Sequence, residues 1–370
     1  MTERTREQQL LLKCATPRLS ASLKEGIGAL VSLPIDWSLL IDLSVAHAVL
    51  PTVAAHLTVA TGVPPAFRER LDRWLIENTA RNLSRTTQLA AVMRLFQDQG
   101  IDAVAWKGPS LAATAYGHVG LRHFDDLDVL VDRAVIRNVV HVMRTRGYSL
   151  CASTARAFSG PVPATGREYR FLPADPALAP IEVQASGAPW PFAVRLDARD
   201  ALRHAVQIDI SGASIRTLGP EDAFLHAAIH GASHCWSQLR LVSDVDATAS
   251  MPIDWTVTLQ RAKAARIDRM VAVAVLLAET LLDTAVPDAV RAEARRDRTA
   301  RQLSAGFAAR LFTPVPSWLR HTWRDWSSWR QREHASDRVR YVTRLIVFDL
   351  FVKQWDWVRQ AVGRTVTAPD

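Results

Sequence analysis

The sequence predicts an α+β protein in which a small mixed sheet is flanked by helical regions. Residues 98–215 contain short, branched apolar runs separated by glycine and proline turns, whereas the residues on either side carry apolar side chains at helical spacing. At 370 residues the chain is also too long for one small core. We therefore expect an N-terminal helical region (1–97), an α/β core (98–215) and a C-terminal helical region (216–370) that is basic toward its end.

The N-terminal region is predicted to be helical scaffold. Apolar residues recur at helical spacing from Leu39 to Val49, and Pro51 stops that run. A longer helix is expected to start after Pro64-Pro65 and to end at Gly100. No dense cluster of titratable side chains occurs in this region.

The central region alternates between predicted strands and helices. Strands are expected at residues 101–106, 127–131, 148–151, 168–172 and 181–184, and helices at 111–116 and 135–146. Residues 220 onward are predicted to be helical again, with further helices opened at 253–255 and spanning 267–282. The last segment, residues 317–360, contains six tryptophans.

Composition indicates a folded globular protein, because hydrophobic residues make up 48% and charged residues 22% of the chain. No apolar run approaches the roughly 18 residues of a membrane span, and the first residues do not resemble a secretory signal. Three widely spaced cysteines offer no disulfide framework and fit a reducing cytosol. We expect a cytoplasmic protein with no membrane partner.

The net charge of +8 belongs to the C-terminal end. Residues 291–370 hold sixteen Lys and Arg against eight Asp and Glu, so the first 290 residues balance to zero. Such a basic segment could attract nucleic acid, an acidic peptide or a nucleotide. The alternative is that it forms an arginine-rich helical surface exposed to solvent. The tryptophans and arginines between Trp318 and Trp329 also allow two interpretations. The aromatic rings could stack on nucleic-acid bases, or they could form the core of a helix covered by arginine side chains.

Two carboxylates, Asp126 and Asp128, open the predicted strand at 127–131. Side chains two apart on a strand point to the same face, and two carboxylates there repel unless a cation lies between them. Mg²⁺ is usually bound by one or two carboxylates together with substrate phosphates. The pair therefore indicates a metal site, with a solvated edge or a helix N-cap as the alternative. Asp125 is expected to face the other way.

A glycine turn, Lys107-Gly108-Pro109-Ser110, precedes this pair within one βα unit. Glycine lets backbone amides approach a phosphate, while Lys107 and Ser110 offer a charge and a hydroxyl. The motif also occurs in ordinary turns, so its value comes from its place before the two aspartates.

Glu182 lies between two apolar residues of a predicted strand. It is either an exposed edge residue or a third acid that binds metal or removes a proton from an attacking hydroxyl.

Three histidines, His226, His230 and His234, lie four residues apart on one predicted helix, followed by Cys235. Histidine and cysteine are the usual zinc ligands, but three ligands along two turns of one helix do not easily converge on one ion. We prefer histidines that pack or line a cleft.

These residues resemble the uncharacterised nucleotidyltransferase family of the DNA polymerase beta superfamily. The similarity covers roughly residues 8–290, and its motifs are Lys107-Gly108, Tyr116, Arg122, Asp126-x-Asp128 with Leu130-Val131, Ile35-Asp36-Trp37, Pro220-Glu221-Asp222, the three histidines, Trp236, Leu239-Arg240 and Asp244. The resemblance implies a polymerase-beta-like core in which Gly108 and Ser110 hold the triphosphate, and Asp126, Asp128 and Glu182 bind Mg²⁺ (or Mn²⁺).

The chain departs from the superfamily pattern in two places. Pro109 separates Gly108 from Ser110, and the chain has Glu182-Val183-Gln184 where relatives often read Asp-x-His. Some relatives are similar to tailoring enzymes of ribosomal peptide natural products, including lasso peptides, which implies a peptide acceptor.

The resulting hypothesis is a Mg²⁺-dependent nucleotidyltransferase that uses ATP or another nucleoside triphosphate, with Lys107 and Arg122 supplying further positive charge. Two alternatives stay open. One is glycosyl transfer from a nucleotide sugar to a phosphorylated peptide at the same metal site. The other is an inactive protein that binds a peptide or, less expected, RNA through its basic end.

Overall fold

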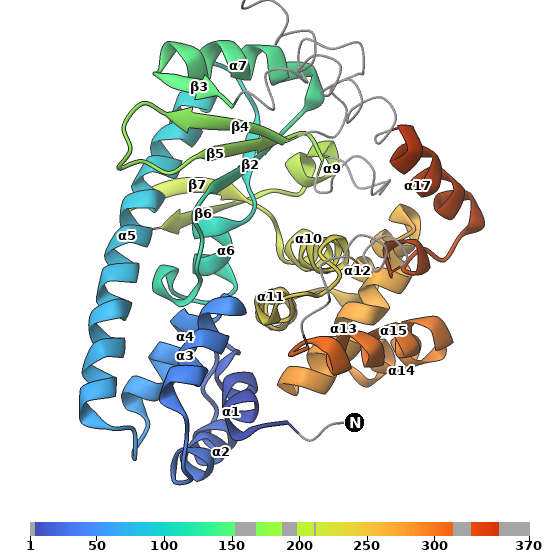
Figure 1. Cartoon of the computed structure of the whole chain (residues 1–370). Helices are drawn as coiled ribbons and strands as arrows, with labels where there is room; N and C mark the ends of the chain where they lie inside the picture. Colours follow the sequence, from blue (N-terminus) through green and yellow to red (C-terminus); the bar gives the residue numbers. More distant parts are fainter. Residues whose placement is uncertain (1–3, 152–167, 187–197, 211, 314–326, 348–370) are drawn as a thin grey trace, which may run out of the picture.

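A seven-stranded mixed sheet forms the upper part of the protein in Figure 1. The computed structural model describes residues 4–151, 168–186, 198–210, 212–313 and 327–347. The strand order is β3-β4-β5-β2-β1-β7-β6. The strands are β1 (Ala103–Ala105), β2 (Leu127–Val131), β3 (Tyr148–Leu150), β4 (Glu168–Pro173), β5 (Ile181–Gln184), β6 (Val206–Ile210) and β7 (Ala213–Thr217).

The centre of the sheet is β5-β2-β1, and the five predicted strands correspond to β1 to β5. β2 pairs with β1 in antiparallel and with β5 in parallel orientation. The β6–β7 hairpin, which turns at Gly212 and joins β1 through β7, was not among the predicted strands. The α+β fold class is confirmed, with helices before and after the sheet.

Five helices precede the sheet: α1 (Arg6–Cys14), α2 (Ala21–Val31), α3 (Trp37–Ala46), α4 (Leu50–Val59) and α5 (Pro65–Asp98). Thr5 and Gln8 form a capping box at the start of α1. As predicted, α5 begins after Pro64 and stops before Gly100, which has a φ of +66°. At 34 residues, or roughly 50 Å, α5 links the N-terminal helices to the sheet (Figure 1).

Helices α5 and α7 (Ile136–Thr145) cover one face of the sheet. Buried residues from both helices join the inward side chains of β2 in one apolar cluster: Leu89, Val92, Phe96, Leu127, Val129, Val131, Val139, Val140 and Met143. Between β1 and β2 the chain forms the short helix α6 (Gly108–Thr114) and the 3-10 turn η1 (Val119–Leu121), and η2 (Arg133–Val135) leads into α7. The opposite face carries a smaller apolar cluster that includes Val104, Leu130, Ala201 and Leu202, with polar side chains beside it.

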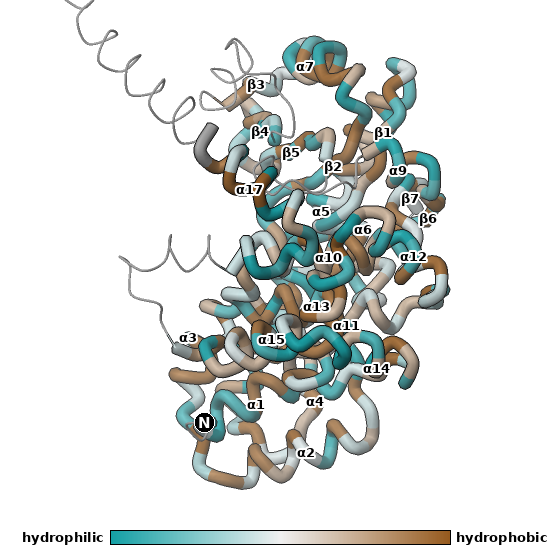
Figure 2. The backbone as a smooth tube through the Cα atoms, turned by 90° about the vertical axis from the view of Figure 1, so that its right-hand side faces the viewer, coloured by the Kyte–Doolittle hydropathy of each residue, from teal (hydrophilic) through white to brown (hydrophobic). Residues whose placement is uncertain are grey.

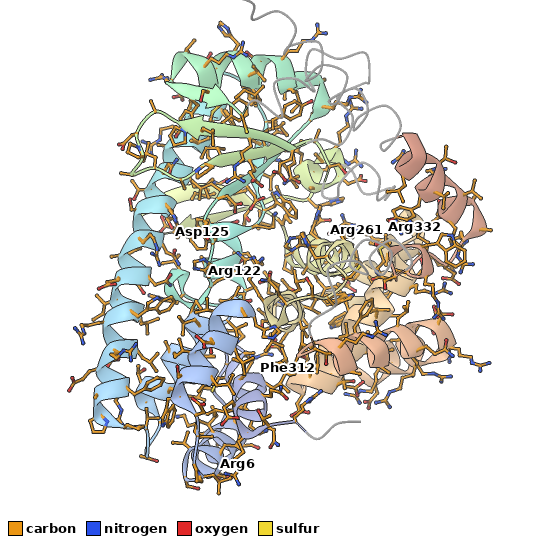
Figure 3. The ribbon with its side chains drawn as sticks, in the orientation of Figure 1. Arg6, Arg122, Asp125, Arg261, Phe312 and Arg332 are labelled. Atoms are coloured by element: carbon orange, nitrogen blue, oxygen red, sulfur yellow. The ribbon has the colours of Figure 1, made fainter. Side chains whose placement is uncertain are left out.

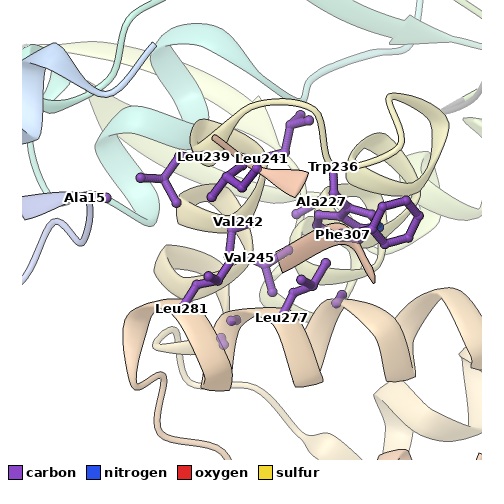
Figure 4. Packing of buried hydrophobic residues seen from close by; sticks show 14 of the residues in the cluster. Ala15, Ala227, Trp236, Leu239, Leu241, Val242, Val245, Leu277, Leu281 and Phe307 are labelled. Carbon is purple, nitrogen blue, oxygen red and sulfur yellow. The ribbon is translucent and has the colours of Figure 1, made fainter. Parts of the chain in front are cut away.

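The helices after the sheet share one core with the N-terminal helices. They are α10 (Pro220–Ser233), α11 (Leu239–Ala249), α12 (Trp255–Ala265), α13 (Asp268–Leu282), α14 (Asp288–Arg296), α15 (Arg298–Arg310) and α17 (Ala335–Val347), while the short α9 (Ala198–Arg203) lies between β5 and β6. Helix α13 is hydrophobic along most of its length (Figure 2) because its neighbours enclose it. Val242 and Val245 of α11 pack against Leu277 and Leu281 of α13 (Figure 4).

Most of the tryptophan-rich segment lies outside the described residues, including Trp318 and Trp323. Trp329 is described, and the Arg338 guanidinium stacks 4.8 Å from its ring centroid. In the described part of the chain, no helix combines the length and the apolar character that crossing a membrane requires.

Candidate active site

A row of polar side chains crosses the sheet face that α5 and α7 leave uncovered. Asp128 of β2 lies directly opposite Glu182 of β5, which in turn lies opposite Arg170 of β4. On the other side of Asp128, the Trp106 amide donates to the Asp128 carbonyl at 3.3 Å. Since strand side chains alternate, Asp126 shares the face of Asp128. The row therefore reads Arg170, Glu182, Asp128 and Trp106, from four adjacent segments.

The neighbouring carboxylate, Asp125, faces away from this row, as the alternation predicts. Its side chain is 71% exposed and binds Arg85 at 3.3 Å and His123 at 2.9 Å. Figure 3 shows Asp125 beside α5. The four residues 125–128 thus include two carboxylates for the polar row and one for the surface.

Asp128 is 3% exposed, and its carboxylate forms an ion pair with the Lys107 ammonium at 2.7 Å. Burial raises the pKa of Asp128 above its ordinary value, and Asp126 adds to this, while Lys107 and Arg122 act against it. A buried carboxylate held beside a second one attracts a cation. In this structure Lys107 supplies that cation.

Glu182 is also buried, and its pKa is raised to about 8. Desolvation is the largest cause, followed by the negative charges of Asp126, Glu168 and Asp128. The partly exposed Arg170 guanidinium, 3.0 Å from a Glu182 oxygen, does not offset them. This clustering of carboxylates supports the interpretation of Glu182 as a third acid rather than an exposed edge residue.

The glycine turn approaches the same row closely. Gly108 has a φ of +53°, and a Cβ at that position would lie 3.4 Å from the Asp126 carbonyl oxygen. The Ser110 hydroxyl is fully buried and donates to the Lys107 carbonyl at 2.9 Å, so it stabilises the first turn of α6. Gly108 therefore brings the chain next to the carboxylates, while Ser110 holds the turn in place.

Arg122 is locked into the helical body by a buried ion pair. Its guanidinium donates two hydrogen bonds to the Asp244 carboxylate, at 2.8 and 2.9 Å, and the Tyr116 hydroxyl donates to the same carboxylate at 2.7 Å. Figure 3 shows Arg122 where the sheet-bearing part meets the helices. The pair fixes residues 116–122 against α11. Arg122 was expected to contact the nucleotide donor, and its ion pair with Asp244 was not predicted.

A model of the family described as uncharacterised nucleotidyltransferase matches residues 34–283, more than half of the chain. The chain belongs to the uncharacterised nucleotidyltransferase family. A search of curated proteins returned no match. Membership of this family implies a nucleoside triphosphate donor and leaves the acceptor open.

His226 is buried on α10 and His230 is half-buried near its end, whereas His234 follows the helix and is exposed. The His226 ring lies 5.1 Å from the Trp106 ring, and the His230 ring lies 4.7 Å from that of His234. Burial and the nearby Lys107 charge lower the pKa of His226 to about 3 and also lower that of His230 well below its ordinary value. Both rings are therefore neutral, and His226 belongs to the surroundings of the polar row.

These histidines do not form a metal cluster. Within the part of the chain that the structure describes, one group of three His, Cys, Asp or Glu side chains has ligand atoms within 4.8 Å of one another: Asp268, Glu333 and His334. It lies at the start of α13 and just before α17, outside the polar row.

Three carboxylates on one sheet face are a donor set that suits Mg²⁺, a hard cation that takes oxygen ligands. Burial, and next the nearby negative charges, raise the pKa of Glu182, so an added cation would relieve the repulsion among the carboxylates. Asp128 is turned toward Lys107 and Glu182 toward Arg170 instead of both toward one point. The residues therefore fit the ion, provided that Lys107 moves off Asp128.

Proposed function

We propose that the protein transfers a nucleotidyl group from a nucleoside triphosphate to an acceptor, with Mg²⁺ or Mn²⁺, at the face formed by β1, β2 and β5. The observation that carries the proposal is the pairing of Asp128 with Glu182 on adjacent strands, with Asp126 on the same face. Lys107 pairs with Asp128 and Arg170 pairs with Glu182, so the three carboxylates outnumber these two cations in a chain that belongs to a nucleotidyltransferase family.

Asp126, Asp128 and Glu182 would hold the metal. When bound, the ion neutralises charge on the phosphates. Lys107 would release Asp128 and pair with the phosphates, where its compact charge suits them. Gly108 would let the backbone approach the triphosphate, and Ser110 would hold that turn.

Arg122 would act through its charge and through the position of its loop. Its guanidinium lies near enough to Asp128 for the two charges to influence each other's pKa, although its hydrogen bonds go to Asp244. The loop it anchors connects the glycine turn to the aspartates.

In the transfer, an acceptor oxygen attacks the α-phosphorus, the bond from that phosphorus to the oxygen bridging to the β-phosphate breaks, and pyrophosphate leaves. The acceptor proton would go to Glu182, which would be ionised, and so able to act as a base, once a cation lies among the three carboxylates.

For the acceptor we propose a peptide, which carries hydroxyl groups and, if phosphorylated, phosphate oxygens. This part of the proposal is supported by the resemblance to natural-product tailoring enzymes, including those of lasso peptides, and by the basic excess of residues 291–370.

The experiment incubates the full chain with each nucleoside triphosphate, Mg²⁺ and candidate peptides, phosphorylated and not, and determines the product mass. We expect a mass gain of one nucleoside monophosphate and release of pyrophosphate. Asp126→Asn should abolish both, while Asp125→Asn, a matched change on the opposite face, should retain them. A hexose added from a nucleotide sugar would instead support glycosyl transfer, and full activity of Asp126→Asn would overturn the metal site.

A further inference from the structure

Two neighbouring aromatic side chains, Trp106 at the end of the polar row and His226 beside it, carry buried polar atoms without hydrogen-bond partners. Trp106 is 4% and His226 2% exposed. Among the residues that the structure describes, neither the Trp106 Nε1 nor either His226 ring nitrogen has a partner. A buried polar group left unpaired costs about 1–3 kcal/mol. Three such atoms on two neighbouring rings therefore indicate a ligand that is bound in the working protein.

The position of the two rings indicates which part of a substrate they would meet. The Lys107 ammonium lies 4.3 Å from the centre of the Trp106 ring and 2.7 Å from Asp128. Trp106 follows β1 directly, on the side of β2 opposite Glu182 on β5. An acceptor that gives its proton to Glu182 approaches from the β5 side. The rings therefore lie on the side of the glycine turn, where the donor phosphates would bind.

The chemistry of the rings indicates the kind of group that they would bind. The neutral His226 ring has one N–H donor and one acceptor nitrogen, and Trp106 adds a second N–H donor. A phosphate has no donor for the free nitrogen of His226. A nucleobase edge or a ribose hydroxyl offers both a donor and an acceptor. The indole of Trp106 adds an apolar surface suited to a base or a sugar.

We propose that His226 and Trp106 recognise the nucleoside part of the donor through these nitrogens. The proposal rests on the proposed function, and it extends the site from the sheet to α10. It also accounts for two buried rings that leave three polar atoms unpaired in the free protein.

The proposal predicts opposite effects on stability and on binding. His226→Phe removes unpaired polar atoms, so the melting temperature should stay the same or rise, while nucleotide affinity falls. His56 provides the matched control because it is equally buried but its Nε2 is hydrogen-bonded to the Thr16 carbonyl at 2.7 Å. His56→Phe should lower the melting temperature and leave nucleotide affinity unchanged.

The test measures calorimetric binding of ATP, GTP, CTP, UTP and inorganic tripolyphosphate to the full chain with Mg²⁺. His226→Phe and Trp106→Phe should weaken binding of the preferred nucleotide about tenfold or more and leave tripolyphosphate unaffected. His226→Asn, which keeps a donor and an acceptor, should restore part of the loss.

Equal weakening of nucleotide and tripolyphosphate binding would overturn the proposal, because it would show a general structural effect. Unchanged binding in both variants would also overturn it and would assign the unpaired atoms to solvent. If the wild-type protein binds tripolyphosphate as tightly as every nucleotide, the nucleoside contact is refuted while the phosphate and metal site stands. If it binds neither, the proposed function fails as well.

Discussion

Replacing Arg122 by methionine tests whether this residue contacts the nucleotide donor or anchors its loop to the helices. The guanidinium is 2% exposed and its partner carboxylate, Asp244, is 3% exposed. Burial raises the pKa of Asp244, but Arg122 and Tyr116 outweigh it and hold that pKa below its ordinary value. Asp244 is therefore ionised in a place where it depends on Arg122 for its charge balance.

The magnitude follows from leaving that carboxylate without its cation. Removing one partner of a buried ion pair costs about 3–5 kcal/mol, whereas replacing both by apolar residues is often neutral. Arg122→Met should therefore lower the free energy of unfolding by about 3–5 kcal/mol, and Arg122→Met with Asp244→Leu should recover most of it. Tyr116→Phe should cost about 1 kcal/mol, since one hydrogen bond is lost.

Urea unfolding at pH 7 measures these differences, with nucleotide binding followed in parallel. Because the folded-state pKa of Asp244 is depressed, the ion pair stabilises the protein above the unfolded-state pKa, and this contribution is lost as the pH falls. The gap between wild type and Arg122→Met should thus narrow toward pH 3–4. If Arg122→Met lowers the unfolding free energy by less than about 1 kcal/mol at pH 7 and strongly weakens nucleotide binding, Arg122 is not a structural anchor and instead contacts the nucleotide directly.

Three further changes test other parts of the site. Asp128→Asn should reduce turnover on the order of 10²–10³-fold or more, with Asp125→Asn as the control, and normal turnover would remove Asp128 from the reaction. Gly108→Ala should lower the unfolding free energy by about 1 kcal/mol, because its φ of +53° disfavours a side chain, and should weaken triphosphate binding; an unaffected protein would show that the turn relaxes freely. The pKa of folded-state His226, about 3, lies below its ordinary value, so between roughly pH 6 and 4 the unfolded chain binds a proton that the folded chain does not, and the unfolding free energy falls as the pH falls. His226→Phe should flatten this dependence by about 1.4 kcal/mol per pH unit. An unchanged slope would mean that His226 is not buried in the neutral form.

Much of the fold was predictable because the signals are local. Pro64 and Gly100 bound α5, and the apolar body of residues 127–131 marks β2. The β6–β7 hairpin was missed because most of its residues are exposed or half-buried, so it lacks the apolar runs that marked the other strands.

The site was predictable only in part, because its residues meet through long-range pairing. The two-residue spacing of Asp126 and Asp128 put both on one face, but the register that sets Glu182 beside Asp128 joins strands that are more than fifty residues apart in sequence. No local pattern shows that Arg122 binds Asp244. For the same reason, the sequence left the role of the α10 histidines open.

The most direct test is a crystal structure with Mn²⁺ and a non-hydrolysable nucleoside triphosphate, with the metal located by its anomalous scattering. We predict Mn²⁺ at about 2.0–2.3 Å from carboxylate oxygens of Asp126 and Asp128, with Glu182 alongside and the Lys107 ammonium moved from Asp128 to a phosphate. Manganese bound elsewhere, with Lys107 still paired to Asp128 and no nucleotide on this face, would contradict the assignment.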